Sequence, residues 1–396
     1  MTTARDARTL WAEDYVRAHC FGGASSAKGP LTFGAELELL AFDAHTFQIA
    51  PIAPRPGSGC SLEAVRDVAR QCAWRETISD KGVPKFVSVD GGSLTFEPGG
   101  QIEYASAVHH SVDGVLVELD RVESALRASA ERVGITLFTV GVDPFNAAEC
   151  APLQLTAPRY RQMAEYFAAI GPDGARMMRQ TASLQVNIGG IEPLEHWAVA
   201  NAITPWLVAL FANSPRYAGA NTGCASFRAQ TWRGVDPSRT GVFAGGDAIR
   251  EYTMFALSAP AFLADDAAPA FIDLDDDLVS HESFSTHLTT LFPEVRPRGY
   301  LELRSLDAVN QAQRRAGLAL IAGLLGDSIA ARDAFDLVGR ANETLLCLAG
   351  TAGLREPRLA SLADDLVRIG AAGCERLGSE IVSESSLGSL HALRHC

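Results

Sequence analysis

Residues 93–104 read Ser93-Leu94-Thr95-Phe96-Glu97-Pro98-Gly99-Gly100-Gln101-Ile102-Glu103-Tyr104. Two alternating runs flank a Pro-Gly-Gly corner, and this pattern predicts a β-hairpin whose turn holds a glycine at positive φ. Because side chains alternate between the two faces of a strand, Glu97, Gln101 and Glu103 are expected on one face and the apolar residues on the other. Two carboxylates therefore lie close together across one hairpin.

The same alternation recurs in residues 32–40, 183–188 and 300–305. The polar residues that share a face within these stretches are Glu36 and Glu38, then Ser183, Gln185 and Asn187, and finally Glu302 and Arg304. Half-exposed antiparallel strands with a solvated face are the alternative interpretation. However, clustered carboxylates repel one another unless cations compensate them. The five glutamates therefore favour a concave sheet that binds metal ions.

The chain has 396 residues, 47% of them hydrophobic, which is enough for one large core or two coupled domains. The formal net charge of −13 argues against a nucleic-acid backbone or an anionic membrane as a partner. The eight cysteines lack CxxC spacing, and neither a signal peptide nor a membrane-spanning stretch is recognisable. We therefore expect a cytoplasmic protein with reduced thiols.

Hydrophobic periodicity predicts many helices and a few strands. The expected helices lie near residues 10–18, 60–74, 111–133, 173–180, 194–212, 248–263, 281–291, 308–325, 328–350 and 358–376, and one more begins at Pro158. Residues 135–142 predict a further strand. We expect a single α+β unit with an N-terminal helix and connector (1–30), a catalytic core (31–325) and a C-terminal helical extension packed on the core (326–396).

Residues 217–246 lack periodicity and are rich in Gly, Ser, Arg and Trp. A loop of this length inside a compact domain is usually functional. It carries Arg228, Trp232, Arg233 and Arg239, and an acidic sheet would attract these guanidinium groups. An ordinary solvated loop is the alternative.

Signatures of several common nucleotide-binding and hydrolytic sites are missing from the sequence, among them the P-loop, the G-x-G-x-x-G turn and the G-x-S-x-G elbow. Clustered carboxylates suit hard cations that prefer oxygen, above all magnesium or manganese. Carboxylates with arginines above them indicate a phosphoryl-transfer site, where positioning and charge neutralisation supply most of the catalysis.

Seven short stretches resemble the glutamate–cysteine ligases, in particular the plant-like group and the actinobacterial enzymes that open ergothioneine biosynthesis. They are GAELE (34–38), FEPGGQIE (96–103), RY (159–160), TASLQVN (181–187), NSP (213–215), HLTTLFPEVR (287–296) and LELR (301–304). The resemblance runs from about residue 30 to 325. It implies a glutamine-synthetase-like, curved antiparallel sheet with helices packed on its outer face.

The resemblance also implies roles for individual residues. The implied ligands of Mg²⁺ or Mn²⁺ are Glu36, Glu38, Glu97, Glu103 and Glu302. Arg304 would contact phosphate, Gln185 and Asn187 would line the nucleotide and metal side, and Arg228 with Trp232 would hold the glutamate α-carboxylate. The other expected substrate-binding residues are Arg159, Tyr160, Ser183 and Arg233.

The function that these features predict is ATP-dependent formation of γ-glutamyl phosphate followed by attack of cysteine, in a monomer or homodimer. Many family members continue Glu-Leu-Ser-Gly where this chain has Tyr104-Ala105-Ser106-Ala107 after Glu103. A γ-glutamyl ligase that uses another amine is therefore one alternative, and a catalytically silent ligand-binding relative is a second.

Overall fold

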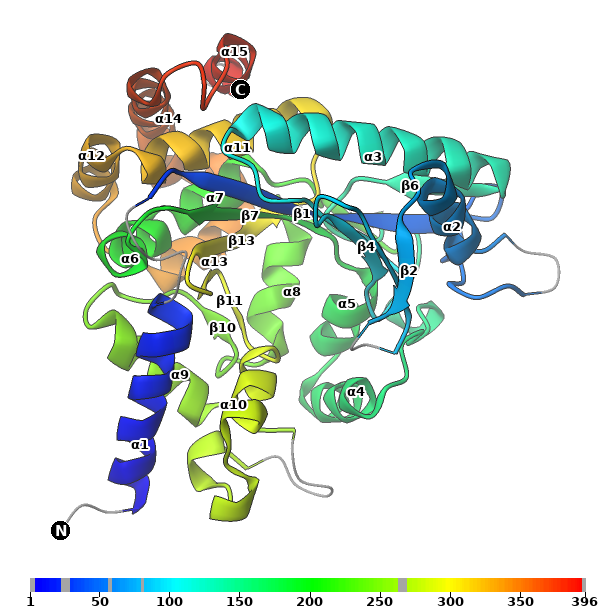
Figure 1. Cartoon of the computed structure of the whole chain (residues 1–396), viewed down its shortest axis with the longest axis horizontal. Helices are drawn as coiled ribbons and strands as arrows, with labels where there is room; N and C mark the ends of the chain where they lie inside the picture. Colours follow the sequence, from blue (N-terminus) through cyan, green and yellow to red (C-terminus); the bar gives the residue numbers. More distant parts are fainter. Residues whose placement is uncertain (1–3, 23–28, 56–58, 80–81, 263–268, 394–396) are drawn as a thin grey trace.

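A sheet of nine strands crosses the middle of the molecule (Figure 1). The computed structural model describes residues 4–22, 29–55, 59–79, 82–262 and 269–393. The strand order is β12-β13-β7-β1-β5-β4-β3-β2, with β6 also paired to β1, and every pair in this sheet is antiparallel. Its strands are β1 (Thr32–Asp43), β2 (Arg75–Ile78), β3 (Pro84–Val87), β4 (Ser93–Phe96), β5 (Ile102–Ala105), β6 (Ile135–Phe138), β7 (Ser183–Gly189), β12 (Val295–Pro297) and β13 (Leu301–Asp307).

The predicted hairpin is confirmed as β4 and β5. The amide of Gly100 donates to the carbonyl of Glu97 over 2.8 Å. Gly100 has a φ of 95°, which residues other than glycine rarely adopt. Thr95 lies opposite Glu103 in the ladder. The short strands β2 and β3 extend this hairpin, and the sequence analysis did not predict them.

The register of β1 builds the polar face of the sheet. Glu38 lies directly opposite Glu103 of β5, and Glu36 lies opposite Gln185 of β7. The intervening Leu37 and Leu39 are buried in the core. The period of two therefore separates a row of acidic groups from the apolar interior.

Helices cover both faces of the sheet, as Figure 1 shows. Helices α3 (Val112–Arg132) and α11 (Gln311–Gly326) lie along the apolar face, which confirms the predicted helices on the outer side. Helices α4 (Pro158–Ile170), α5 (Asp173–Gln180), α8 (Phe227–Val235), α9 (Ala248–Ser258) and α10 (His281–Leu288) lie on the other side, with α1 (Ala4–Tyr15) beside α9. Helix α2 (Ser61–Gln71) packs on α3.

Several element boundaries differ from the predicted ones. Residues 194–212 form two helices, α6 (Pro193–Ala202) and α7 (Thr204–Leu210), because Pro205 cannot donate the hydrogen bond of a continuous helix. Residues 328–350 also form two helices, α12 (Ser328–Val338) and α13 (Glu343–Ala352), which Gly339 separates with a φ of 76°.

Residues 217–246 are not the expected long loop, because they contain helix α8 and three two-residue strands. These strands are β8 (Arg216–Tyr217), β9 (Ala220–Asn221) and β10 (Thr240–Gly241), and β10 pairs with β11 (Phe292–Pro293). The hydroxyl of Ser226 accepts from the amide of Ala229 and caps α8. The helix was overlooked because its buried face includes arginine and tryptophan instead of a regular aliphatic stripe.

The two ends of the chain both pack on the core. A π-helical segment, Val16–Phe21, continues α1, and the predicted connector at residues 23–28 lies outside the described residues. At the other end, α14 (Pro357–Leu377) packs so closely on α11 that a Cβ on Gly323 would lie 2.0 Å from the carbonyl oxygen of Gly370. A last helix, α15 (Glu384–Ala392), was not predicted. None of the described helices is long and apolar enough to cross a membrane.

Candidate active site

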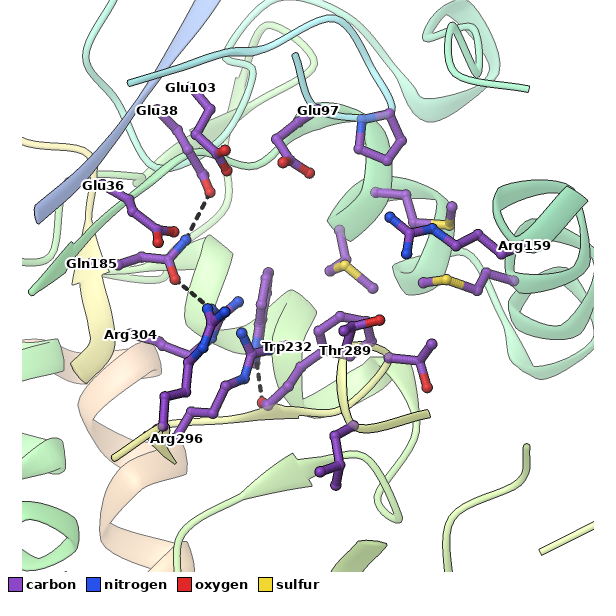
Figure 2. A pocket seen from close by; sticks show the side chains of 18 of the residues that line it. Glu36, Glu38, Glu97, Glu103, Arg159, Gln185, Trp232, Thr289, Arg296 and Arg304 are labelled. Atoms are coloured by element: carbon purple, nitrogen blue, oxygen red, sulfur yellow. Dashed lines mark hydrogen bonds between the residues drawn. The ribbon is translucent and has the colours of Figure 1, made fainter. Parts of the chain in front are cut away.

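The polar face of the sheet forms one wall of a cavity of about 510 Å³. Figure 2 shows carboxylates along one side of this cavity and guanidinium groups facing them. Of the residues predicted to act in a site, the cavity lining includes Glu36, Glu38, Glu97, Glu103, Arg159, Tyr160, Gln185, Trp232 and Arg304. The fold therefore brings together residues that are up to 268 positions apart, from Glu36 to Arg304.

Glu38 occupies the middle of the acidic row. Its carboxylate accepts from the backbone amide of Ser183 over 2.7 Å and from the side-chain amide of Gln185 over 3.1 Å. Burial, and then the nearby charge of Glu97, raise the pKa of Glu38, and these effects outweigh Arg228 and Arg304. Neutral donors and a like charge thus surround this carboxylate.

Glu302, on β13, has a different environment. It is completely buried, and its carboxylate lies 3.1 Å from Arg296, 3.4 Å from Arg304 and 3.8 Å from Arg298. Burial opposes ionisation, but the three guanidinium groups outweigh it and lower the pKa of Glu302. Glu302 lies behind these arginines and is not one of the residues on the cavity wall.

Glu36 lies between these two environments. Burial, and then the negative charge of Glu302, raise the pKa of Glu36 to about 7. The positive charges of Arg304, Arg298 and Arg296 oppose this shift. Arg304 also donates to the side-chain oxygen of Gln185. Gln185 thus joins the carboxylate of Glu38 to the guanidinium of Arg304.

The donor set fits a hard divalent cation in part. In the residues that the structure describes, no three His, Cys, Asp or Glu side chains converge closely enough to hold a metal ion by themselves. Four carboxylates nevertheless face one cavity, and magnesium takes few protein ligands and completes its shell with phosphate and water. These residues therefore suit an ion that binds together with a polyphosphate.

Helix α4 forms the opposite end of the cavity, where Arg159 stands in an apolar wall (Figure 2). The guanidinium of Arg159 donates to the hydroxyl of Tyr160 over 2.9 Å and lies 4.8 Å from its ring centroid. The apolar side chains of this end are Met163, Met177, Met178 and Phe292. One cation in an apolar wall suits the carboxylate of a small amino acid.

Two predicted substrate contacts from α8 have other partners. Arg228 is buried, donates to the backbone oxygen of Arg304 over 2.8 Å and lies 3.7 Å from Asp307. Its guanidinium stacks on the ring of Trp232, and Trp232 also lines the cavity. Arg233 pairs with Glu294 at 2.9 Å and with Glu343 at 2.6 Å. Neither arginine is part of the cavity lining.

Ser183, Asn187 and Arg239 also lie off the cavity wall. Ser183 acts through its backbone amide on Glu38, and Asn187 lies opposite Glu302 in the ladder between β7 and β13. Arg239 is buried beside Asp236 at 3.2 Å instead of facing the sheet. The expectation that the acidic sheet attracts the arginines of residues 217–246 is therefore wrong for Arg239.

Two residues of the segment after Glu103, Tyr104 and Ser106, make their contacts outside the cavity. The ring of Tyr104 stacks on Trp74 with centroids 5.7 Å apart, and its hydroxyl donates to Glu118. The hydroxyl of Ser106 accepts from the amide of Ala35 over 3.0 Å. These side chains are not part of the cavity lining, and the use of another amine, which this departure from the family pattern suggests, stays a prediction.

Several polar and aromatic residues of the wall were not among the predicted site residues. Arg296 lies on β12 and Arg298 follows it directly after the strand, and this spacing beside Glu302 and Arg304 was a usable signal. Others, Tyr15, His19 and Cys20, come from the N-terminal helical segment. No local sequence pattern in this segment predicts a contact with a cavity.

Three comparisons place these observations among known proteins. A family model described as glutamate-cysteine ligase family 2 (GCS2) matches residues 32–356. The chain is 33% identical over 400 residues to the glutamate–cysteine ligase EgtA of Mycolicibacterium smegmatis, covering 94% of this chain and 87% of that protein. It is 28% identical over 384 residues to the chloroplastic glutamate–cysteine ligase of Arabidopsis thaliana, covering 89% and 72%.

Among solved structures, the fold is similar to that of the glutamate–cysteine ligase from Francisella tularensis, determined in complex with AMP. The TM-score is 0.55 at 13% identity, with 94% of this chain and 82% of that chain covered. The resemblance drawn from the sequence motifs and the fold that it implies are thus confirmed.

Proposed function

We propose that this chain, which belongs to the glutamate-cysteine ligase family 2 of ATP-dependent carboxylate–amine ligases, forms γ-glutamylcysteine from glutamate and cysteine. The observation that carries the proposal is the arrangement of charges in one cavity. The guanidinium groups of Arg296 and Arg304 face the carboxylates across one part of the cavity, and Arg159 stands in an apolar wall at the other end (Figure 2). This arrangement matches a polyphosphate and a cation held between the two rows, with an amino acid beside them.

In the first step, a γ-carboxylate oxygen of glutamate attacks the γ-phosphorus of ATP, which gives γ-glutamyl phosphate and ADP. In the second step, the cysteine amino group attacks the acyl carbon, phosphate leaves with the C–O bond electrons, and the nitrogen loses one proton. Positioning and charge neutralisation supply most of the rate enhancement in such transfers.

The residues divide this work between them. Arg296, Arg298 and Arg304 would receive the polyphosphate, and Glu302 holds these guanidinium groups in place through its buried charge. Glu36, Glu38, Glu97 and Glu103 would hold Mg²⁺ or Mn²⁺, which neutralises phosphate charge when bound.

Arg159, on the wall of the amino-acid end, would bind the glutamate α-carboxylate. Arg228 lies off the cavity wall and would position the backbone of Arg304, one of the arginines that receive the polyphosphate. The substrates are small molecules. A cytoplasmic location, the oligomeric state and the division at residues 30 and 325 stay predictions from the sequence.

Phosphate release with ATP, glutamate and a panel of amines tests the proposal. We expect release to require both glutamate and an amine, with cysteine the preferred acceptor and γ-glutamylcysteine identified by mass spectrometry. Preferential use of another amine would replace the acceptor but keep the mechanism. Phosphate release that does not depend on glutamate would contradict the proposal.

A further inference from the structure

The N-terminal helical segment lines the cavity although it precedes the part of the chain that the family model matches. The family match begins at residue 32, whereas Tyr15, His19 and Cys20 belong to the cavity wall. This part of the wall therefore lies outside the residues that the family model matches.

Contacts along its length hold the segment in place. Arg8 donates to the carbonyl oxygens of Ile272 over 2.9 Å and Leu274 over 2.6 Å. The carbonyl oxygen of Cys20 accepts from the amide of Gly299 over 2.6 Å, and the ring of Phe21 packs edge-on against Trp197 at 5.2 Å. The position of the segment is therefore fixed by the core at both ends.

Two aromatic rings of the segment lie next to each other on the wall. The centroids of Tyr15 and His19 are 4.4 Å apart. Tyr15 is half-buried against His281 at 5.1 Å and Phe284 at 5.2 Å, while His19 is exposed. Packing thus supports one ring from behind and leaves ring surface open to the cavity.

This aromatic wall adjoins the arginine end of the cavity. Cys20 is hydrogen-bonded to Gly299, the neighbour of Arg298, and the side chain of Arg298 is 51% exposed. Burial raises the pKa of the Cys20 thiol to about 12, so the thiol is neutral at physiological pH and adds no negative charge near the arginines. Arg159 and the methionines occupy the other end, on helices α4 and α5.

We infer that Tyr15 and His19 form the stacking surface for the purine base of the nucleotide, with its phosphates directed toward Arg298 and Arg296. The inference rests on the proposed function. A purine base is uncharged and has two π faces, so aromatic rings beside guanidinium groups suit a nucleoside polyphosphate. Both amino-acid substrates carry an α-carboxylate, which Arg159 can bind at the other end, whereas the arginines beside the aromatic wall are assigned to the phosphates.

Binding of Mg-ATP and of Mg-tripolyphosphate, measured by calorimetry without amino acids, separates the base from the phosphates. We expect His19→Ala and Tyr15→Ala each to weaken ATP binding by roughly 5- to 150-fold, the range that base stacking gives. Tripolyphosphate has no base, so its dissociation constant should stay at the wild-type value. His19 is exposed, so His19→Ala tests the inference even if Tyr15→Ala fails to fold.

Leu10→Ala is the matched control, because Leu10 lies on the same helix and is 58% exposed. It should bind both compounds as the wild type does. Unchanged ATP binding in both ring variants would overturn the inference, as would equal losses for ATP and tripolyphosphate. If the wild type binds neither compound, the proposed function fails with it; normal wild-type binding with unaffected variants sinks the inference alone.

Discussion

Glu302 and Glu38 are the same residue type in the same sheet, yet their carboxylates are balanced in opposite ways. Three guanidinium groups lie within 3.8 Å of Glu302 and lower its pKa. Glu38 accepts from neutral groups, faces Glu97 and has a raised pKa. The β13 side of the acidic row thus has guanidinium groups that compensate its carboxylate, whereas under the proposed function a cation that arrives with the substrate would compensate the carboxylates on the β1 side.

Removing divalent metal should have the largest effect, because it acts on carboxylates whose burial and mutual repulsion outweigh the nearby guanidinium groups. We expect chelation to lower turnover by roughly three orders of magnitude, since a metal ion supplies several kcal/mol of charge stabilisation in phosphoryl transfer. Added Mg²⁺ or Mn²⁺ should restore turnover. Full activity after exhaustive chelation would show that the β1 side needs no cation.

Glu302→Gln should mainly lower stability. It leaves the buried guanidinium groups of Arg296 and Arg304 without their counter-ion, and breaking a buried pair in this way costs about 3–5 kcal/mol. Urea-induced unfolding of the metal-free protein measures the loss.

Glu97→Gln is the matched variant for that measurement. Glu97 faces the cavity next to Glu38, so relief of like-charge repulsion should keep unfolding within about 1 kcal/mol of the wild type while turnover falls. Equal destabilisation by the two variants would remove the distinction between the two sides.

His287 makes the unfolding free energy depend on pH independently of the carboxylates on β1 and β13. Burial lowers the pKa of His287 to about 4, and nearby Arg239 adds to the shift. His287 Nε2 lies 2.8 Å from the oxygen of Ala256, and the ring packs against Phe271. In the unfolded chain, His287 therefore binds a proton below about pH 6.5, whereas in the folded protein it binds one only below about pH 4.

Stability should accordingly fall as the pH drops from about 6.5 to 4, with His287 contributing at most about 3 kcal/mol. His287→Gln cannot be protonated in this range, so its unfolding free energy should depend less on pH in urea titrations. A pH dependence identical to that of the wild type would assign the whole acid effect to other groups.

Arg159→Lys should have the smallest effect, and it concerns the amino-acid end. A lysine cannot form the planar two-bond pair with a carboxylate, so we expect KM for glutamate to rise roughly tenfold with KM for ATP unchanged. Arg228→Lys is the comparison, because Arg228 contacts the backbone of Arg304. A larger rise of the glutamate KM in Arg228→Lys would return the carboxylate contact to Arg228.

The strands in which polar and apolar residues alternate could be predicted from the sequence. Strands β1, β5, β7 and β13 alternate cleanly, and their alternation placed Glu36, Glu38, Glu103 and Gln185 on one face before any tertiary contact was known. Helix α8 could not be recognised in this way, since Arg228 and Trp232 occupy its buried side. Tyr15 and His19 reach the cavity only through packing against α10, which leaves no trace in local sequence.

The ladder between β1 and β5 also constrains how the gene can change in length. Glu38 faces Glu103 while Leu39 faces Ile102, so inserting one residue into β5 upstream of Glu103 would exchange the wall of the cavity with the interior along the remainder of that strand. Substitutions can alter the reaction and the core separately, but a single-codon insertion or deletion damages both at once. Viable length variation should therefore be confined to connections between strands, and a deep insertion scan should leave a gap over residues 32–39 and 102–105.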